Sequence, residues 1–271
     1  MTSERSEQET VAFEVKDGIA WVKFNRPEKR NCMSPKLNRQ MMRVLDELEF
    51  REDVGVLVLS GEGAAWSAGM DLKEYFRENE AKGLGATRAA QREAYGWWRR
   101  LRWYQKPTIA MVNGWCFGGA FQVLLACDLA IADENATFGL SEINWGILPG
   151  GGASKVIAEL TGFRNAMYHA MTGENIDGRK AAAWGLVNEA VPAEQLEARV
   201  SEVAALLLEK NSVALKITKD AIRRVRVVHD HQIELLAHCR VALEQPAQHV
   251  RRERAAGVLV NLQLAGLCTQ G

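Results

Sequence analysis

The sequence predicts an α/β fold, in which strands alternate with helices and a mainly parallel sheet is covered by those helices. Two observations predict it: short β-branched apolar runs bounded by glycine and proline, and longer amphipathic segments between them. The chain has 271 residues, of which 47% are hydrophobic, so it can bury a large core in one domain or a domain with a helical appendage. Crossovers between the parallel strands are expected to be right-handed.

The first element is expected to be a β-hairpin. Residues 11–24 alternate apolar and polar side chains around Asp17-Gly18, a dipeptide that favours a two-residue hairpin turn. Ser34 and Pro35 then form an N-cap and first-position pair, which predicts a helix that continues to about Glu49.

Buried strands are expected at short apolar runs, residues 55–60 and 107–112, with a third over 125–132. An amphipathic segment between the first two predicts a long helix over 87–104. Further helices are predicted over residues 154–160, 178–184 and 193–208.

From Val213 onward the sequence is helical and basic, with Arg223, Arg224 and Arg226 close together. Such a cluster is either a solvated helix face or a patch for nucleic acid or an acidic partner, and the balanced charge of the chain favours the solvated face. We expect a core domain over residues 1–200 and a helical region over 201–271.

Charge and composition argue against several partners. Thirty-four basic residues balance thirty-four acidic ones, so no net field recruits nucleic acid or an anionic membrane. The first ten residues lack an apolar targeting segment, and no run is long enough to cross a bilayer, so a cytoplasmic location is expected. The five cysteines show no CxxC pairing and are expected to be reduced thiols: Cys32, Cys116, Cys127, Cys239 and Cys268.

Phosphate-binding and hydrolase motifs are missing from the sequence. There is no GxxxxGK[ST], the run Gly150-Gly151-Gly152 lacks the GxGxxG spacing, and no GxSxG is found. The histidines at 229, 231 and 238 do not share a helix face, so no metal site is expected.

Two glycine-rich turns carry the chemistry, over residues 67–72 and 113–120, each after a strand-like run. Turns of this kind can present bare N–H groups to one oxygen, as a thioester needs when negative charge builds on its carbonyl. A third segment, residues 138–142, adds the carboxylate of Glu142. Taken alone, each turn also fits an ordinary strand-to-helix connection.

Together with residues 25–31 and 185–188, these segments resemble the enoyl-CoA hydratase/isomerase (crotonase) superfamily, from about residue 11 to residue 226. The resemblance implies a crotonase-type ββα spiral core with a C-terminal helical region. That region, residues 201–271, would pack across subunits of a homotrimer or a dimer of trimers.

Residues 68–76, 113–119 and 140–147 are most similar to the hydroxycinnamoyl-CoA (feruloyl-CoA) hydratase-lyases. These enzymes hydrate a side-chain double bond and cleave the adduct by a retro-aldol step, giving an aromatic aldehyde such as vanillin and acetyl-CoA. The resemblance implies an acyl-CoA substrate, with no cofactor beyond its CoA thioester and no metal.

The resemblance also implies the roles of individual residues. Met70 and Gly119 would supply the oxyanion-hole N–H groups, and Glu142 would transfer protons if an apolar pocket raises its pKa. The residues that would bind CoA are Lys29, Arg30, Ala68, Asp71 and Leu72. The residues that would line the acyl pocket are Tyr75, Ser141, Trp145, Gly150 and His238.

Two positions depart from the family pattern. Three residues after the oxyanion-hole glycine, ordinary hydratases have a second glutamate and the hydratase-lyases a serine, whereas this chain has Gln122. A neutral amide can orient water but cannot act as an acid or base, so Glu142 would carry the proton transfers alone. The second departure is His238, where the hydratase-lyases place a tyrosine that binds the substrate phenol.

Two other functions therefore remain open. One keeps the fold and changes the substrate: an enoyl-CoA hydratase, isomerase or thioester hydrolase that acts on an aliphatic acyl-CoA. The other is a catalytically silent CoA-binding homologue, which the retention of Glu142 disfavours.

Overall fold

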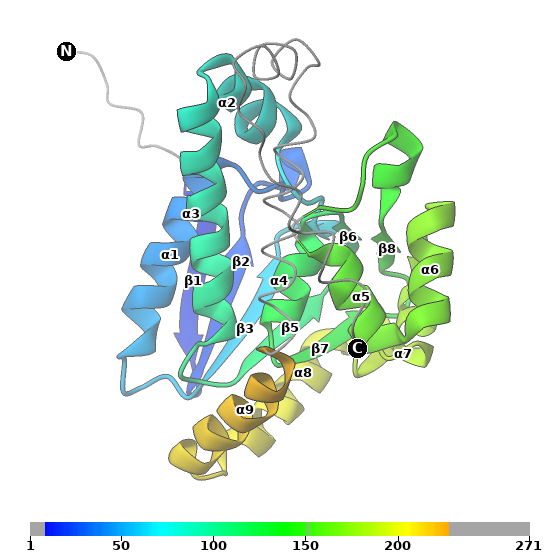
Figure 1. Ribbon diagram of the computed structural model, residues 1–271. Helices are drawn as coiled ribbons and strands as arrows, with labels where there is room; N and C mark the ends of the chain where they lie inside the picture. Colours follow the sequence, from blue (N-terminus) through cyan, green and yellow to red (C-terminus); the bar gives the residue numbers. More distant parts are fainter. Residues whose placement is uncertain (1–8, 151, 228–271) are drawn as a thin grey trace, which may run out of the picture. The chain divides into compact units, whose positions relative to one another are not determined.

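The computed structural model describes residues 9–150 and 152–227, and the described residues up to Arg224 belong to one compact unit. His238, Cys239, Cys268 and most of the predicted C-terminal region lie outside the described residues. The α/β prediction is confirmed, because helices cover a mainly parallel sheet (Figure 1).

The main sheet has six strands in the order β1-β2-β3-β5-β7-β10, and only the β1–β2 pair within it is antiparallel. A second, four-stranded sheet has the order β4-β6-β8-β9, in which β4, β6 and β8 are parallel. The strands are β1 (Val11–Lys16), β2 (Ile19–Phe24), β3 (Val56–Gly61), β4 (Ala65–Ser67), β5 (Thr108–Val112), β6 (Trp115–Phe117), β7 (Leu129–Asp133), β8 (Thr137–Gly139), β9 (Ile176–Asp177) and β10 (Glu189–Val191).

Helices fill most of the connections. The α-helices are α1 (Pro35–Glu49), α2 (Glu78–Ala81), α3 (Leu84–Arg102), α4 (Ala120–Ala126), α5 (Ala153–Thr161), α6 (Phe163–Thr172), α7 (Gly178–Ala183), α8 (Ala193–Leu208) and α9 (Ser212–Val227). Three further helical turns are the 3-10 helices η1 (Pro27–Lys29) and η3 (Ser141–Trp145) and the π-helical turn η2 (Leu72–Arg77).

Alternate side chains of the central strands pack on opposite faces of the main sheet. In β3, Val58 lies in a cluster with Leu196 and Val200 of α8, whereas Leu57 and Leu59 belong to the larger core that includes α1, α3 and α4. Both faces of β3 are buried, which explains why its sequence is a continuous apolar run.

Local signals place the first elements as predicted. Asp17 and Gly18 both have positive φ and join β1 to β2 in register. The Ser34 hydroxyl accepts a hydrogen bond from the N–H of Leu37 at 3.2 Å, and Pro35 is the first residue of α1.

The strand predicted over residues 125–132 is wrong in its first half. Leu125 and Ala126 end α4, and the strand β7 begins only at Leu129. An apolar run of this length fits a buried helix as well as a strand, and here α4 takes the first residues because it starts directly after the second glycine turn.

The basic segment of α9 is only partly a solvated face. Arg223 donates to Asp128 at 2.6 Å and Lys219 forms an ion pair with the same carboxylate at 2.7 Å. Only 10% of the Arg223 side chain is exposed, so this arginine anchors α9 to the core, whereas Arg224 is exposed. Of the described residues, no helix is long and apolar enough to cross a bilayer.

Candidate active site

The two glycine-rich turns lie directly against each other. Gly69 has φ +84°, and a Cβ atom there would lie 2.5 Å from the carbonyl oxygen of Phe117 and 3.0 Å from the amide nitrogen of Gly119. The strands that lead into the turns, β4 and β6, pair in parallel. Because only glycine allows so close an approach, Gly69 sets the spacing between the turns.

The N–H groups of Met70 and Gly119 are free to bind an outside acceptor. The neighbouring amides are used, since those of Asp71 and Gly118 donate to backbone carbonyls at 3.0 and 3.1 Å. Within the described part of the chain, neither Met70 nor Gly119 donates a backbone hydrogen bond in these turns. Two unpaired N–H groups on contacting turns can hold one oxygen that gains negative charge.

Glu142 lies beside this pair of turns. It is on η3, and its Oε1 atom would be 3.1 Å from a Cβ atom at Gly118, which has φ +51°. The Oε2 atom is buried and has no hydrogen-bond partner among the described residues. Burial raises the pKa of Glu142, and a bond from its own backbone N–H only partly offsets this. A carboxyl group that is desolvated and unpaired is suited to proton transfer.

Gln122 is on the first turn of α4, where its backbone N–H donates to the Gly119 carbonyl at 3.1 Å. Its side-chain Nε2 is buried and lacks a partner among the described residues. A Cβ atom at Gly152 would lie 3.4 Å from this nitrogen. The helix that follows the second turn therefore carries a buried amide donor without a partner among the described residues, three residues after Gly119.

The residues predicted to line the acyl pocket differ in their burial. Tyr75, on η2, is 7% exposed and packs edge to face with Phe76, and burial raises its pKa, so its phenol stays protonated. Trp145 is 78% exposed, Ser141 is half-buried and Gly150 is exposed. The structure thus puts Ser141, Glu142 and Trp145 on one helical turn, and their contacts with an acyl group stay predictions.

The residues predicted to bind CoA surround the first turn. Lys29, Arg30 and Leu72 are exposed and Ala68 is half-buried. The N–H of Ala68 donates to the carbonyl of Arg30 at 2.9 Å, which ties the first turn to the segment after η1.

Asp71 differs from the other residues predicted to bind CoA because its side chain already has partners within the protein. It is 5% exposed, it accepts bonds from the N–H groups of Lys73 and Glu74, and it pairs with Arg26 at 3.2 Å. Burial acts to raise the pKa of Asp71, but hydrogen bonds from the Glu74 amide and Cys32 and the charge of Arg26 lower it. The backbone of Asp71 is engaged as well, because its N–H donates to the Met33 carbonyl and its carbonyl accepts from the Tyr75 N–H, both at 3.0 Å, so a contact of Asp71 with CoA stays a prediction.

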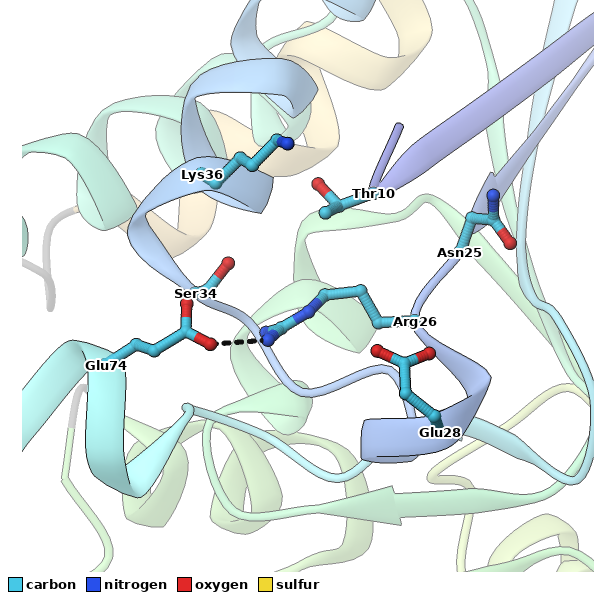
Figure 2. A pocket seen from close by; sticks show the side chains of 7 residues that line it. All are labelled: Thr10, Asn25, Arg26, Glu28, Ser34, Lys36 and Glu74. Atoms are coloured by element: carbon cyan, nitrogen blue, oxygen red, sulfur yellow. Dashed lines mark hydrogen bonds and ion pairs between the residues drawn. The ribbon is translucent and has the colours of Figure 1, made fainter. Parts of the chain in front are cut away.

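Sequence reasoning missed the buried polar network around Arg26. Its guanidinium bonds to Asp71 and also to Glu74 at 2.7 Å, and Figure 2 shows the Arg26–Glu74 pair at the wall of a polar cavity of about 230 Å³. No predicted site residue lines this cavity, whose walls are Thr10, Asn25, Arg26, Glu28, Ser34, Lys36 and Glu74. Nothing in the sequence around a single arginine between a strand and a turn predicts that its side chain is buried.

A second buried polar group supports α4. His169 of α6 is fully buried, packs against Phe121 of α4 and Trp184, and has no side-chain hydrogen-bond partner among the described residues. Burial lowers the pKa of His169, and the positive charge of Lys180 acts in the same direction. The imidazole is therefore neutral at physiological pH.

Comparison with known proteins identifies the family of this chain. A family model described as enoyl-CoA hydratase/isomerase matches residues 14–257. The chain is 56% identical over 227 residues to a hydroxycinnamoyl-CoA hydratase-lyase of Pseudomonas fluorescens, covering 83% of this chain and 82% of that protein. It is 32% identical over 205 residues to the 2,3-dehydroadipyl-CoA hydratase of Escherichia coli, covering 76% and 78%.

A solved structure of a relative has a similar fold. The enoyl-CoA hydratase of Bacillus anthracis superposes with a TM-score of 0.75 at 27% identity, covering 92% of this chain and 96% of that one. This match and the family model both extend over most of the chain. The chain belongs to the enoyl-CoA hydratase/isomerase (crotonase) family.

Proposed function

We propose that this protein is a lyase that hydrates a hydroxycinnamoyl-CoA thioester and cleaves the adduct to an aromatic aldehyde and acetyl-CoA. The observation that carries the proposal is the unpaired Glu142 carboxyl group beside the Met70 and Gly119 N–H groups. The 56% identity to a hydroxycinnamoyl-CoA hydratase-lyase supports the choice of substrate and of lyase chemistry.

Hydration begins when the thioester oxygen accepts hydrogen bonds from the Met70 and Gly119 N–H groups. Water adds to the carbon β to the thioester, and Glu142 takes one proton from that water. The electrons of the double bond move to the thioester oxygen, and the resulting enolate is held by the two N–H groups. Protonation of the α carbon by Glu142 completes the hydroxyacyl-CoA and restores the carboxylate.

Gln122 and Glu142 offer complementary groups to the attacking water. The buried Nε2 of Gln122 can donate to the water oxygen, and the buried Oε2 of Glu142 can accept a proton from it. In this assignment Gln122 orients the water and transfers no proton.

Cleavage reuses the same groups. Glu142 removes the proton of the β-hydroxyl group, the oxygen forms the aldehyde carbonyl, and the bond between the α and β carbons breaks. Its electrons form the enolate of acetyl-CoA in the same oxyanion hole, and Glu142 returns the proton to the α carbon. The atoms balance: one water and one enoyl-CoA give one aldehyde and one acetyl-CoA.

An aromatic substrate is supported by the aromatic side chains on the two segments beside the site. Tyr75 combines a ring with a protonated hydroxyl group, so it can stack on a phenol ring and hydrogen-bond to it. Trp145, on the turn that carries Glu142, exposes most of its indole and can pack against the aromatic ring of the substrate. The predicted contact of His238 lies outside the described residues.

The protein is further proposed to act as a homotrimer or a dimer of trimers in the cytoplasm. Exposed apolar side chains along α6 support a subunit contact, because Phe163, Met167 and Met171 recur every four residues on one helix face and are 68%, 42% and 64% exposed. Mass measurement in solution tests the assembly.

The test is to incubate the protein with feruloyl-CoA and follow both the loss of conjugated absorbance and the appearance of vanillin, with crotonyl-CoA as the comparison substrate. Loss of absorbance together with vanillin supports the proposal. Loss without vanillin indicates a hydratase that does not cleave. Faster turnover of crotonyl-CoA indicates an aliphatic substrate, and binding of both thioesters without turnover indicates a silent homologue.

A further inference from the structure

The guanidinium group of Arg30 lies over the indole ring of Trp115, 4.1 Å from the ring centroid. Arg30 is the residue after η1, and Trp115 is the first residue of β6, so the contact joins two segments far apart in the sequence. A stacked guanidinium leaves its edge open, and its N–H groups all lie in the plane of that edge. The contact therefore fixes the charge and leaves its donors available.

Among the described residues Arg30 has no carboxylate partner, unlike several arginines that are held by ion pairs. Arg26, Arg100 and Arg223 are each paired with an acidic side chain. No ion pair or side-chain hydrogen bond among the described residues includes Arg30, and its side chain is exposed. The neighbouring Lys29 is likewise exposed, so two unneutralised cations lie next to each other.

The backbone of Arg30 is held as firmly as its side chain. Arg30 has φ +51°, which is unfavourable for a residue with a side chain. Its N–H donates to Pro27 at 3.0 Å and its carbonyl accepts from Ala68 at 2.9 Å. Bonds on both sides therefore hold this strained backbone conformation, from which the side chain stacks on Trp115.

Trp115 is in turn fixed relative to the oxyanion hole. Its ring packs against that of Phe117 at a centroid distance of 5.4 Å, and the Phe117 carbonyl oxygen lies 2.5 Å from the position that a Cβ atom at Gly69 would take. Gly114, just before it, approaches the backbone of Ala64 so closely that a Cβ atom there would lie 2.2 Å from the Ala64 oxygen. Trp115 itself is 38% exposed, so part of its ring lies at the surface of strand β6.

We propose that Trp115 is a positioning residue that holds the Arg30 guanidinium as an anchor for a phosphate group of the CoA substrate. The proposal rests on the proposed function, since it concerns the CoA half of the same thioester. Arginine binds phosphate through paired N–H donors, and a stacked guanidinium loses less conformational freedom when it does so. Trp115 thereby fixes the CoA end of the substrate relative to the oxyanion hole.

The first experiment measures the binding of free CoA by calorimetry, which needs no turnover. Arg30→Met, which keeps the length and removes the charge, is expected to raise the Kd about tenfold. Trp115→Leu is expected to raise it about threefold by releasing the guanidinium, whereas Trp115→Phe, which keeps an aromatic face, restores most of the affinity. Lys180→Met is the matched control, because Lys180 lies 4.9 Å from the ring centroid of Trp184 in another cation–π pair.

The second experiment identifies the phosphate. Free CoA, dephospho-CoA and pantetheine are compared with each variant, because the second lacks the 3′-phosphate and the third lacks all phosphates. If Arg30 holds the 3′-phosphate, its substitution weakens CoA and spares dephospho-CoA; if it holds the pyrophosphate, both weaken. With feruloyl-CoA, Arg30→Met and Trp115→Leu are expected to raise KM more than they lower kcat.

Two results would overturn the proposal. One is an unchanged Kd for CoA in either Arg30→Met or Trp115→Leu. The other is an equal loss with pantetheine, because Trp115 would then act by shaping the turns and not through a phosphate. Failure of the proposed function is a different outcome: normal CoA binding by the wild-type protein with no turnover of feruloyl-CoA leaves the phosphate anchor intact.

Discussion

Replacing Gly69 with alanine tests whether the contact between the two turns sets the oxyanion hole. A methyl group at this position would lie 2.5 Å from the Phe117 carbonyl oxygen, about 0.9 Å closer than the 3.4 Å at which ordinary contact begins. It would also lie 3.0 Å from the Gly119 nitrogen, which is one of the two proposed donors. The neighbouring backbone cannot move like a flexible side chain, so the turns must separate.

The expected effect on activity follows from this displacement. Moving one oxyanion-hole donor by nearly 1 Å is expected to lower kcat for feruloyl-CoA on the order of 10²-fold. The strain of φ +84° for alanine adds about 1 kcal/mol of lost stability. Steady-state kinetics give kcat and KM, and urea unfolding gives the free energy of unfolding.

The matched control is Gly162→Ala. Gly162 also has positive φ, at +77°, but a Cβ atom there meets nothing within 4 Å. This variant is expected to lose stability and to keep kcat. If Gly69→Ala keeps kcat within about threefold of the wild type while remaining folded, the spacing of the turns does not matter and the assignment of Met70 and Gly119 is wrong.

Three further predictions concern buried ionisable groups. Glu142→Gln should lower kcat about 10²- to 10⁴-fold. Because burial raises the folded-state pKa of Glu142, the wild-type protein gains stability when this group is protonated and loses it as pH rises. Glu142→Gln should therefore be more stable than the wild type at pH 7, and the difference should shrink toward pH 4. Equal unfolding curves of the two proteins at pH 7 would argue against a desolvated carboxylate. The lowered pKa of His169 gives the opposite pH dependence of stability. Stability should fall as pH drops below about 6.5, where the imidazole of the unfolded chain takes up a proton. His169→Phe should reduce this fall, as measured by thermal unfolding between pH 7 and 5. Asp71→Ala should lower the free energy of unfolding in urea by about 3 kcal/mol, since it removes a helix cap and leaves Glu74 as the one carboxylate paired with the buried Arg26 among the described residues. A loss below about 1 kcal/mol would contradict this account of the network.

The elements that the sequence predicts well are those with local causes. The hairpin depends on Asp17-Gly18, and α1 depends on Ser34 and Pro35, so neighbouring residues suffice. The short strands of the second sheet have two or three residues each and no alternating pattern, and they exist because distant segments pair. Sequence periodicity cannot reveal such strands.

Part of the candidate site can likewise be predicted from the sequence, and part depends on the fold. The two glycine turns and Glu142 are visible as motifs, but their contact depends on the parallel pairing of β4, β6 and β8. Asp71 illustrates the limit, because it matches a CoA-site motif while its side chain caps η2 and pairs with Arg26. The hydrogen-bond partners of a buried polar group are its neighbours in three dimensions, and spacing along the chain does not identify them.

The most direct test of the central claim is the vibrational spectrum of the bound thioester. Feruloyl-CoA with a ¹³C-labelled thioester carbonyl is bound to Glu142→Gln, which slows turnover, and the carbonyl stretch is compared with that of the free thioester. If the Met70 and Gly119 N–H groups hold this oxygen, the stretch shifts to lower frequency, and the shift is lost when Gly69→Ala is added. An unshifted carbonyl in the bound complex would contradict the oxyanion hole and the mechanism built on it.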